Sequence, residues 1–381
     1  MKSILILAFS NLKSDARVTR QVNFIKDHYD VTVFCFDAYD SPGVKIYKVR
    51  PTKLTFLKKA ICSIFLLLGM HDVAYRILFP YHKHATDLNK GFDMIIANDI
   101  ESLPLAFKIS NSKSKIFFDA HEYAPRQFED RLYWRIFFRR FNVYLCNRYI
   151  PKVDGMSTIN NGLANEYEIH FGIKPIVITN AANYFQLSPQ KIEGNAIKLV
   201  HHGIFTLSRS PDLMVDLFNT LDDRYTLDLI YMLPENSSKK TRAYFEEFKI
   251  KASRTGRIRV LPALKSSEII PFLNKHYDMG IILVPPVNFN YENGLPNKLF
   301  DCIQARMGMA VGPLKEIAHI TDKYKIGIVS KDFTAQGFAQ ELNKLTTADI
   351  MKFKENAQHA AEEMNSDINK AQLLQMLSQL S

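Results

Sequence analysis

The stretch that decides the fold runs from Asn290 to Pro313 and reads NYENGLPNKLFDCIQARMGMAVGP. It follows an apolar run, Met279–Val284, that we expect to be a buried strand, and it passes through a Gly-Leu-Pro turn into a helical pattern. It then enters a second apolar run at Met309–Val311. Such a unit is typical of an open α/β sheet, and ligands of these sheets bind at the carboxyl ends of the strands.

The beginning of the expected helix has the chemistry of an anion site. Backbone amides at the start of a helix favour negative charge, and Lys298 on the first turn adds a positive charge beside them. Asp301, on the same helix, can accept hydrogen bonds from hydroxyl groups. This combination suits a nucleotide sugar, with its diphosphate on the amides and the lysine and its ribose on the acid.

Composition indicates a globular chain of two ordinary domains. Of its 381 residues, 47% are hydrophobic and 23% are charged, which allows a sizeable core. The four cysteines are scattered and form no Cys-x-x-Cys pair, so neither a disulfide framework nor a structural zinc site is indicated, and we expect a reducing cytoplasm. The apolar run Ile4–Phe9 is too short for a signal peptide, and no segment reaches the roughly 20 apolar residues of a spanning helix.

The positive charge is concentrated in the amino-terminal half. The chain has 49 Lys and Arg against 39 Asp and Glu, a net charge of +10. Residues 1–190 hold 25 basic and 17 acidic residues, and therefore +8 of that charge. A basic half implies an anionic partner, which is a membrane surface, a lipid phosphate or nucleic acid.

Short apolar runs alternate with helical patterns along the whole chain, as expected for parallel sheets with right-handed crossovers. The expected strands are Ser3–Phe9, Val31–Phe36, Met94–Ala97, Lys115–Asp119, Gly155–Ile159, Ile176–Thr179, Ile197–His202, Tyr225–Met232, Arg257–Leu261, Met279–Val284 and Met309–Val311. A polar stretch near residues 186–196 is the expected hinge. We predict an α/β fold of two Rossmann-like domains facing across a cleft, at residues 1–187 and 196–365, with a C-terminal helix at 366–381 that crosses back to the first domain.

Two basic segments of the first half are unusually apolar or aromatic. In the segment from Lys53 to Leu78, Lys58 and Lys59 precede the run AICSIFLLLGM. A second basic face has Arg131, Arg135 and Arg139 at helical spacing, with aromatic residues between them. Both segments fit either ordinary amphipathic helices packed on a sheet or helices that lie on a membrane surface.

Six segments stand in an order that one enzyme family shares: Asp15–Gln21, Asn98–Ala106, Asp119–Tyr123, Val177–Tyr184, Leu199–Asp212 and Pro296–Ala305. On these segments the chain resembles, nearly end to end, the GT-B-fold glycosyltransferases of the retaining, metal-independent kind that build bacterial surface glycans. The resemblance implies a transferase that moves a sugar from a nucleoside-diphosphate sugar to a glycan or lipid-linked acceptor. It implies an acceptor-binding first domain, a donor-binding second domain, and a cytoplasmic location, peripheral on the inner membrane leaflet.

The resemblance also implies donor-binding residues. Gly203 stands where the family has a glycine at the end of the first strand of the second domain, and Arg209 stands where a basic residue meets the donor diphosphate. The family often adds an arginine directly after the glycine, where this chain has Ile204, so that contact is absent or is supplied by Lys298. The backbone of Gly294, Leu295 and Asn297 is expected to cradle sugar and phosphate, and the base is expected to rest against the loop that begins at Leu261.

The chain departs from the family's Glu-x(7)-Glu pattern. Asp301 takes the place of the second acid, which binds the ribose. Glu292 lies nine positions before it, not eight, and is either the acid of the sugar and catalytic region or a solvated loop residue.

The acceptor side is expected at the end of the strand KIFFD. There the resemblance gives His121 a role at the donor sugar or the reacting region, with Glu122 beside it. A retaining enzyme needs no strong general base, whereas in an inverting one Asp99, Glu101, His121 or Glu122 could serve as base. The chain has no Asp-x-Asp motif for a metal, so cationic side chains and a helix dipole are expected to neutralise the leaving diphosphate without a metal or other cofactor.

Four other classes of protein are alternatives. A dehydrogenase is disfavoured because no Gly-x-Gly-x-x-Gly follows an expected strand, and nucleic-acid binding because no reader motif accompanies the charge. A GT-B-fold sugar-nucleotide epimerase would keep the donor pocket. A catalytically decayed scaffold that binds lipid or a partner would agree with the changes at Ile204 and Glu292.

Overall fold

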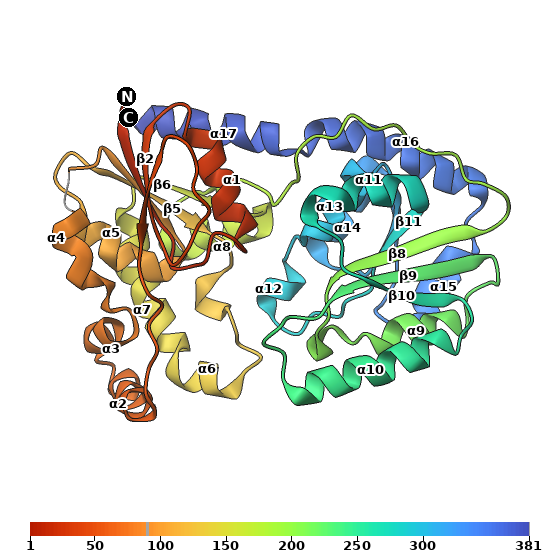
Figure 1. Ribbon diagram of the computed structural model, residues 1–381, viewed down its shortest axis with the longest axis horizontal. Coiled ribbons are helices and arrows are strands. Elements are labelled where there is room, and N and C mark those ends of the chain that lie inside the picture. Colours follow the sequence, from red (N-terminus) through yellow and green to blue (C-terminus); the bar gives the residue numbers. More distant parts are fainter. Residues whose placement is uncertain (89–90, 381) are drawn as a thin grey trace. The chain divides into compact units, whose positions relative to one another are not determined.

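The computed structural model describes residues 1–88 and 91–380, which form two compact units (Figure 1). Unit 1 comprises Met1–Thr179, Asn288–Tyr291 and the residues from Asn369 onward, and unit 2 comprises Asn180–Val287 and Glu292–Ile368. The division after Thr179 falls earlier than the expected hinge. The segment that follows it is bound to unit 2, because the backbone of Phe185 accepts a hydrogen bond from Arg306 at 2.7 Å and donates one to Gln304 at 3.1 Å.

Unit 1 is built on one parallel sheet in the order β3-β2-β1-β4-β5-β6-β7, the strand order of a Rossmann fold with one strand added. Its strands are β1 (Ser3–Leu7), β2 (Asp30–Cys35), β3 (Val44–Lys48), β4 (Met94–Asn98), β5 (Lys115–Ala120), β6 (Gly155–Thr158) and β7 (Ile176–Val177). Its helices are α1 (Ala16–Ile25), α2 (Phe56–Leu67), α3 (His71–Leu78), α4 (Ala85–Leu88), α5 (Leu103–Ile109), α6 (Leu132–Phe137), α7 (Arg139–Tyr149) and α8 (Asn161–Phe171). Short 3-10 turns are η1 (Pro80–His84), η2 (Ile100–Ser102), η3 (Ala124–Arg126) and η4 (Ile150–Lys152).

Unit 2 repeats the arrangement with a parallel sheet in the order β10-β9-β8-β11-β12-β13. Its strands are β8 (Ile197–Ile204), β9 (Tyr225–Met232), β10 (Ile258–Pro262), β11 (Met279–Ile282), β12 (Gly308–Val311) and β13 (Gly327–Val329). Its helical elements are η5 (Leu207–Arg209), α9 (Asp212–Phe218), α10 (Lys239–Ser253), α11 (Ser266–His276), α13 (Asn297–Gln304), α14 (Lys315–Tyr324), α15 (Ala335–Asn343) and α16 (Thr347–Glu363). The short α12 (Phe289–Glu292) begins in unit 1, and its last residue counts with unit 2.

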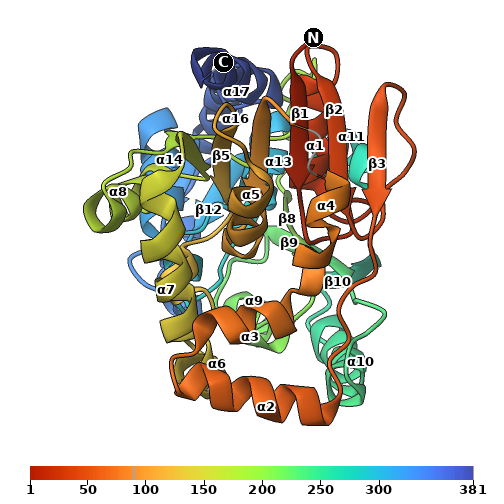
Figure 2. The same ribbon diagram turned by 90° about the vertical axis from the view of Figure 1, so that its left-hand side faces the viewer.

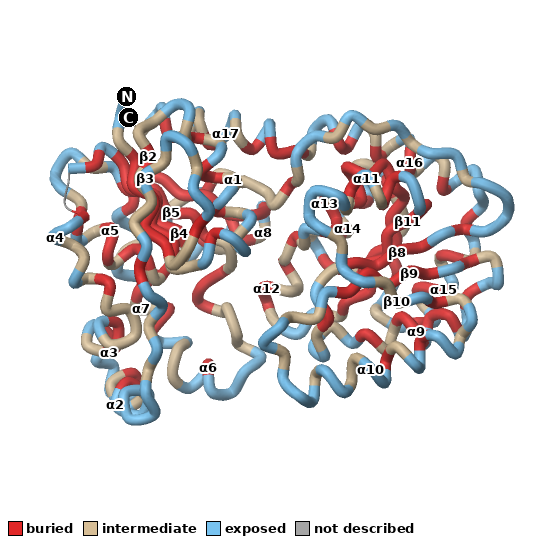
Figure 3. Tube along the Cα trace, viewed as in Figure 1, coloured by how far each residue is buried: buried red, intermediate tan, exposed pale blue. Residues whose placement is uncertain are grey.

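Both faces of the first sheet are buried at its central strands, which explains why these strands are apolar runs without alternation. Leu5 and Leu7 of β1 belong to a core that includes α5 and α7, while Ile4 and Ile6 belong to one that includes α1. The second core also contains Leu373 and Leu377 of α17 (Ser366–Leu380). Figure 3 shows the strands as the most buried parts of each unit and α2 as largely exposed.

Three details differ from the sequence interpretation. The edge strands β3 and β13 were not expected. The last helical tract is two helices, α16 and α17, separated at Met364 and Asn365. The arginine face is not one helix, because Arg131 is the N-cap of α6 and Arg139 begins α7 after a break at Phe138.

Candidate active site

In unit 2 the polar side chains gather at the switch point of the sheet. Strands β8 and β11 are neighbours, and the chain leaves them toward opposite sides of the sheet, so a crevice is expected outside their carboxyl ends. The end of β8 carries His201, His202 and Gly203, and the segment after β11 leads into α13 with Lys298 and Asp301.

Gly203 is approached by two cations. Its φ is +136°, and a Cβ placed on it would lie 3.5 Å from Nζ of Lys298 and 3.8 Å from Nη1 of Arg209. Arg209 has one long hydrogen bond, at 3.4 Å to the carbonyl of Ile204. Within residues 1–88 and 91–380, neither cation has a carboxylate within 4 Å. Two cations without a counter-ion beside a bare backbone make a site for an anion.

Lys298 is held by a histidine and not by an acid. Its Nζ lies 2.9 Å from Nε2 of His201, whose Nδ1 lies 2.8 Å from the carbonyl oxygen of Ile281. The ring therefore donates from Nδ1 to Ile281 and accepts from Lys298 at Nε2. Burial and then the charge of Arg209 lower the pKa of Lys298 to about 7. Burial and then the charge of Lys298 lower the pKa of His201 well below its usual value.

Asp301 lies at the same end of the sheet and pairs with His202. Its Oδ2 is 3.0 Å from Nε2 of that ring, and both side chains are mostly buried. Among the described residues no partner of Oδ1 occurs, so one carboxylate oxygen is left to accept hydrogen bonds.

The other expected donor residues are more dispersed. Gly294 and the buried Leu295 lie in the segment before α13, and Asn297 is its exposed first residue. Leu261 of β10 pairs with Ile230 of β9, and Ile230 pairs with His202 of β8. Leu261 therefore lies two strands away from His202, at the same level of the sheet. Glu292 forms an ion pair with Lys315 at 3.5 Å, and its side chain is 43% exposed.

In unit 1 the polar cluster is organised by the buried Asp119 at the end of β5. Its carboxylate accepts hydrogen bonds from Arg17 and Gln21 of α1, both at 3.1 Å, and from Ser157 of β6 at 2.6 Å. His121 lies 3.5 Å from it through Nε2. Burial alone would raise the pKa of Asp119, but Arg17 and His121 hold that pKa below its usual range.

The acids expected on the acceptor side surround His121. Asp99 lies 3.5 Å from Nδ1 of the ring, and its φ of 61° is a strained backbone conformation of the kind found at functional sites. Burial opposes the charged imidazole, but Asp99 and Asp119 raise the pKa of His121. Burial and then Asp99 raise the pKa of Glu101 to about 7, and the same two causes raise the pKa of Glu122.

Sequence reasoning missed four residues of these clusters: His201, His202, Arg17 and Asp119. His201 was passed over inside the segment VHHG, where two histidines precede the glycine that ends a strand. Arg17 lies in DARVTRQ and Asp119 in DAHEY, two segments that were recognised as motifs. Their pairing across 102 residues is the information that the sequence did not supply.

The residues expected at a membrane lie on the outer helices of unit 1. Lys58, Lys59, Arg135 and Arg139 are all exposed. Beside them α2 and α6 expose large apolar side chains, namely Phe56, Leu57, Ile61, Ile64, Leu67, Leu132, Tyr133 and Ile136. The two helices are neighbours, since Oγ of Ser63 lies 3.4 Å from the hydroxyl of Tyr133. Among the described helices, none is both long and apolar enough to cross a bilayer.

Two Rossmann-like units, each with polar side chains at the carboxyl ends of its strands, are the arrangement of the GT-B fold, and solved structures confirm the predicted fold. Sucrose-phosphate synthase from Thermosynechococcus elongatus is similar over 100% of this chain and 99% of its own, with a TM-score of 0.73 at 10% identity. A UDP-forming trehalose-phosphate synthase from Burkholderia vietnamiensis covers 99% of this chain and 100% of its own, with a TM-score of 0.68 at 11% identity.

A third similar structure is Anabaena HepE in complex with UDP and glucose. It covers 99% of this chain and 100% of its own, with a TM-score of 0.64 at 15% identity. No protein-family model matches the sequence, and no curated protein is similar enough in sequence to count as a relative. The similarity therefore establishes the fold, and the function is argued from the site.

Proposed function

We propose that this protein is a glycosyltransferase that moves a sugar from a nucleoside-diphosphate sugar to a hydroxyl group of a glycan or lipid-linked acceptor in bacterial polysaccharide biosynthesis. The observation that carries the proposal is the approach of Lys298 and Arg209 to Gly203, without a carboxylate, at the switch point of the second sheet. A diphosphate is the group whose charge and size suit two such cations.

The donor half of the reaction falls to unit 2. Lys298 and Arg209 bind the diphosphate and stabilise the negative charge that grows on it as the glycosidic bond breaks. A bound diphosphate favours the protonated form of Lys298 and raises its pKa from the value of about 7 in the free protein. Asp301, positioned by His202, binds the ribose through its remaining oxygen. No metal is required in this scheme, since the cations provide the charge. In the described part of the chain, no group of three or more His, Cys, Asp or Glu side chains is arranged so that it could hold a metal ion.

The acceptor half falls to unit 1. His121, held between Asp99 and Asp119, binds hydroxyl groups in the reacting region. We propose a retaining reaction, in which the leaving phosphate takes the acceptor proton. An inverting reaction is the second candidate, and one observation favours it: Glu101, with its pKa raised to about 7, is suited to act as a general base near neutral pH.

We further propose that the enzyme is cytoplasmic and binds the inner membrane leaflet through α2 and α6. Phe56, Leu57 and Leu68 are 88%, 68% and 68% exposed, which is unusual for side chains of this size. The basic residues beside them would add about 1 kcal/mol each at an anionic lipid surface. Such binding suits an enzyme whose acceptor is attached to a lipid.

The experiment is a donor screen. The purified protein is incubated with UDP-, GDP-, ADP- and dTDP-linked sugars, and release of the nucleoside diphosphate is measured. UDP-glucose is used first, because it is bound in a solved structure of Anabaena HepE, which is similar to this protein. Turnover of one donor, retained in EDTA, supports a metal-independent transferase. Interconversion of the sugar without release supports the epimerase alternative, and binding without turnover supports the scaffold.

A further inference from the structure

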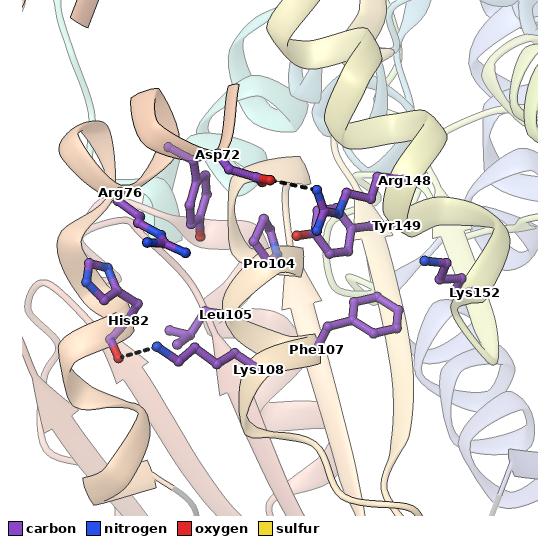
Figure 4. Close-up of a pocket in the computed structure, with 11 residues that line it drawn as sticks. Asp72, Arg76, His82, Pro104, Leu105, Phe107, Lys108, Arg148, Tyr149 and Lys152 are labelled. Carbon is purple, nitrogen blue, oxygen red and sulfur yellow. Dashed lines mark hydrogen bonds and ion pairs between the residues drawn. The ribbon is translucent and has the colours of Figure 1, made fainter. Parts of the chain in front are cut away.

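Unit 1 contains a second basic site, outside the clusters at the strand ends. It is a cavity of about 580 Å³ between α3, α5, α7 and the 3-10 turns η1 and η4 (Figure 4). A cavity of this size is in the range that holds small ligands. None of the residues assigned above to donor, acceptor or membrane lines it.

The lining of this cavity is strongly cationic. Four basic side chains, from four different elements, face a single carboxylate: Arg76, Lys108, Arg148 and Lys152 against Asp72. Figure 4 shows Arg76, Lys108 and Arg148 reaching in around Pro104.

Counting partners among the described residues, only one of these cations is neutralised. Arg148 donates to Asp72 at 2.8 Å, and its position is fixed further by a hydrogen bond to the hydroxyl of Tyr144. Among the described residues, the only hydrogen-bond partner of Lys108 is the carbonyl oxygen of His82, at 3.5 Å. For Arg76 and Lys152 no hydrogen bond or ion pair occurs within the described part of the chain. The cavity therefore holds about three positive charges in excess.

The remaining lining is suited to the non-ionic part of a ligand. Tyr149, Phe107 and Leu105 supply apolar surface. The hydroxyl of Tyr75 is already used, since it donates to the carbonyl of Glu101 at 2.8 Å. Burial and then the charges of Lys108 and Arg76 lower the pKa of His82, so that this ring is neutral at physiological pH and adds no further charge.

We propose that this cavity is a binding site for a phosphate monoester or diphosphate group. Guanidinium and ammonium donors from several elements, with one acid to orient Arg148, match the three or more acceptor oxygens of such a group. The group has two sources, an anionic lipid headgroup or a soluble phosphate ester. The lipid is favoured by position, because α3 follows α2 directly and packs against it (Figure 2). In addition, α2 exposes apolar side chains. The proposal does not depend on the glycosyltransferase assignment.

The test is calorimetric titration of sodium pyrophosphate into the full-length chain. It is done in an Arg209→Gln/Lys298→Met background, so that binding at the proposed donor site does not contribute. We expect saturable binding that weakens about ten-fold or more when Arg76→Gln and Lys108→Gln are added, since each removes a charge-assisted hydrogen bond. The matched control adds Lys113→Gln and Lys174→Gln, two exposed lysines of unit 1 that do not line the cavity, and it should bind as the background does.

Absence of saturable binding in the background, or equal binding by the cavity variant and the control, would overturn the proposal. A second arm identifies the source with phosphatidylcholine vesicles that contain phosphatidic acid, a phosphate monoester. Weaker sedimentation of the cavity variant, with the control unchanged, supports the lipid headgroup. Unchanged sedimentation together with lost pyrophosphate binding supports a soluble phosphate ester.

Discussion

Nζ of Lys298 lies 2.9 Å from Nε2 of His201, and the ring is turned so that it can only accept. A buried ammonium with a neutral partner is costly, and burial lowers its pKa to about 7. The free protein thus keeps a cation that is only partly charged at neutral pH. The bound anion supplies the missing counter-charge, which makes affinity and stability respond to pH in opposite ways.

The stability prediction concerns the protein without ligand. Lysine has an ordinary pKa of 10.5 in the unfolded chain, and about 7 in the folded one. Between these values the unfolded chain binds more protons, so the free energy of unfolding rises with pH, by up to about 1.4 kcal/mol per pH unit. Below about pH 7 the lysine is charged in the folded protein, and the full cost of burying that charge lowers the free energy of unfolding. Denaturant titrations should show that the free energy of unfolding of the wild type rises relative to that of Lys298→Met as pH rises through this window. If the two free energies changed in parallel with pH, the lowered pKa would not belong to Lys298.

The affinity prediction has the opposite sign. An anion binds the protonated lysine better, so the affinity for a nucleoside diphosphate should fall as pH rises above about 7. Isothermal titration over this range measures it. In Lys298→Met the affinity should be lower throughout and nearly independent of pH; an equal pH dependence in both proteins would assign the titration to another group.

Gly203→Ala should abolish donor binding. The new Cβ would occupy the space 3.5 Å from Nζ of Lys298, at a φ of +136° that other residues avoid, so a loss of about 1–2 kcal/mol of stability is also expected. Gly256→Ala is the matched control, since Gly256 has φ +69° and nothing within 4 Å of its would-be Cβ. It should lose stability and keep binding. If both variants bound nucleotide equally well, the anion site would lie elsewhere.

A large part of the fold could be predicted from sequence because the central strands are buried on both faces and read as apolar runs. The strands that were missed, β3 and β13, lie at sheet edges. Val44–Lys48 alternates lysines with half-buried residues, and Gly327–Val329 is only three residues long. Neither has the composition of a central strand.

The site was predictable to the extent that its residues lie within one motif. Gly203, Arg209 and Lys298 could be named from the sequence because each belongs to a recognisable local segment, and the structure brings the three together. The partner of Lys298 was missed because it stands 97 residues away and depends on how β8 and α13 meet. For Glu292 the sequence left two readings open, a residue of the sugar region or a solvated loop acid, and its role stays a prediction; the structure adds its ion pair with Lys315.

The role of Glu101 separates two stereochemical outcomes. For the retaining reaction that we propose, Glu101→Gln should lower kcat by less than about ten-fold, because no general base acts in the transition state. A general base is worth about 100-fold or more. Proton NMR of the fresh product gives the anomeric configuration. The retaining proposal would be replaced by an inverting one if the product had the inverted configuration and Glu101→Gln lowered kcat by about 100-fold or more. The variant would then also lack the change in rate that the wild type shows near pH 7.

Membrane binding should depend on charge from both α2 and α6–α7. We expect sedimentation with vesicles containing anionic lipid at low salt, and its loss at high salt, since exposed charges are screened. Lys58→Glu/Lys59→Glu and Arg135→Glu/Arg139→Glu should each weaken it strongly. A double reversal in unit 2, Lys239→Glu/Lys331→Glu, serves as the control. No sedimentation at low salt would favour a soluble acceptor.

The most direct test of the central claim is the affinity of nucleoside diphosphates for Arg209→Gln/Lys298→Met, measured by titration calorimetry with UDP, GDP, ADP and dTDP and with EDTA present. Each removed cation gives up a charge-assisted hydrogen bond of about 1.5–3 kcal/mol, so the preferred nucleotide should bind at least about 100-fold more weakly than it binds wild type. The fold should survive, because an apolar side chain replaces a buried cation at 298. A folded double variant that binds the same nucleotide as tightly as wild type would contradict the assignment of a donor diphosphate site at Gly203.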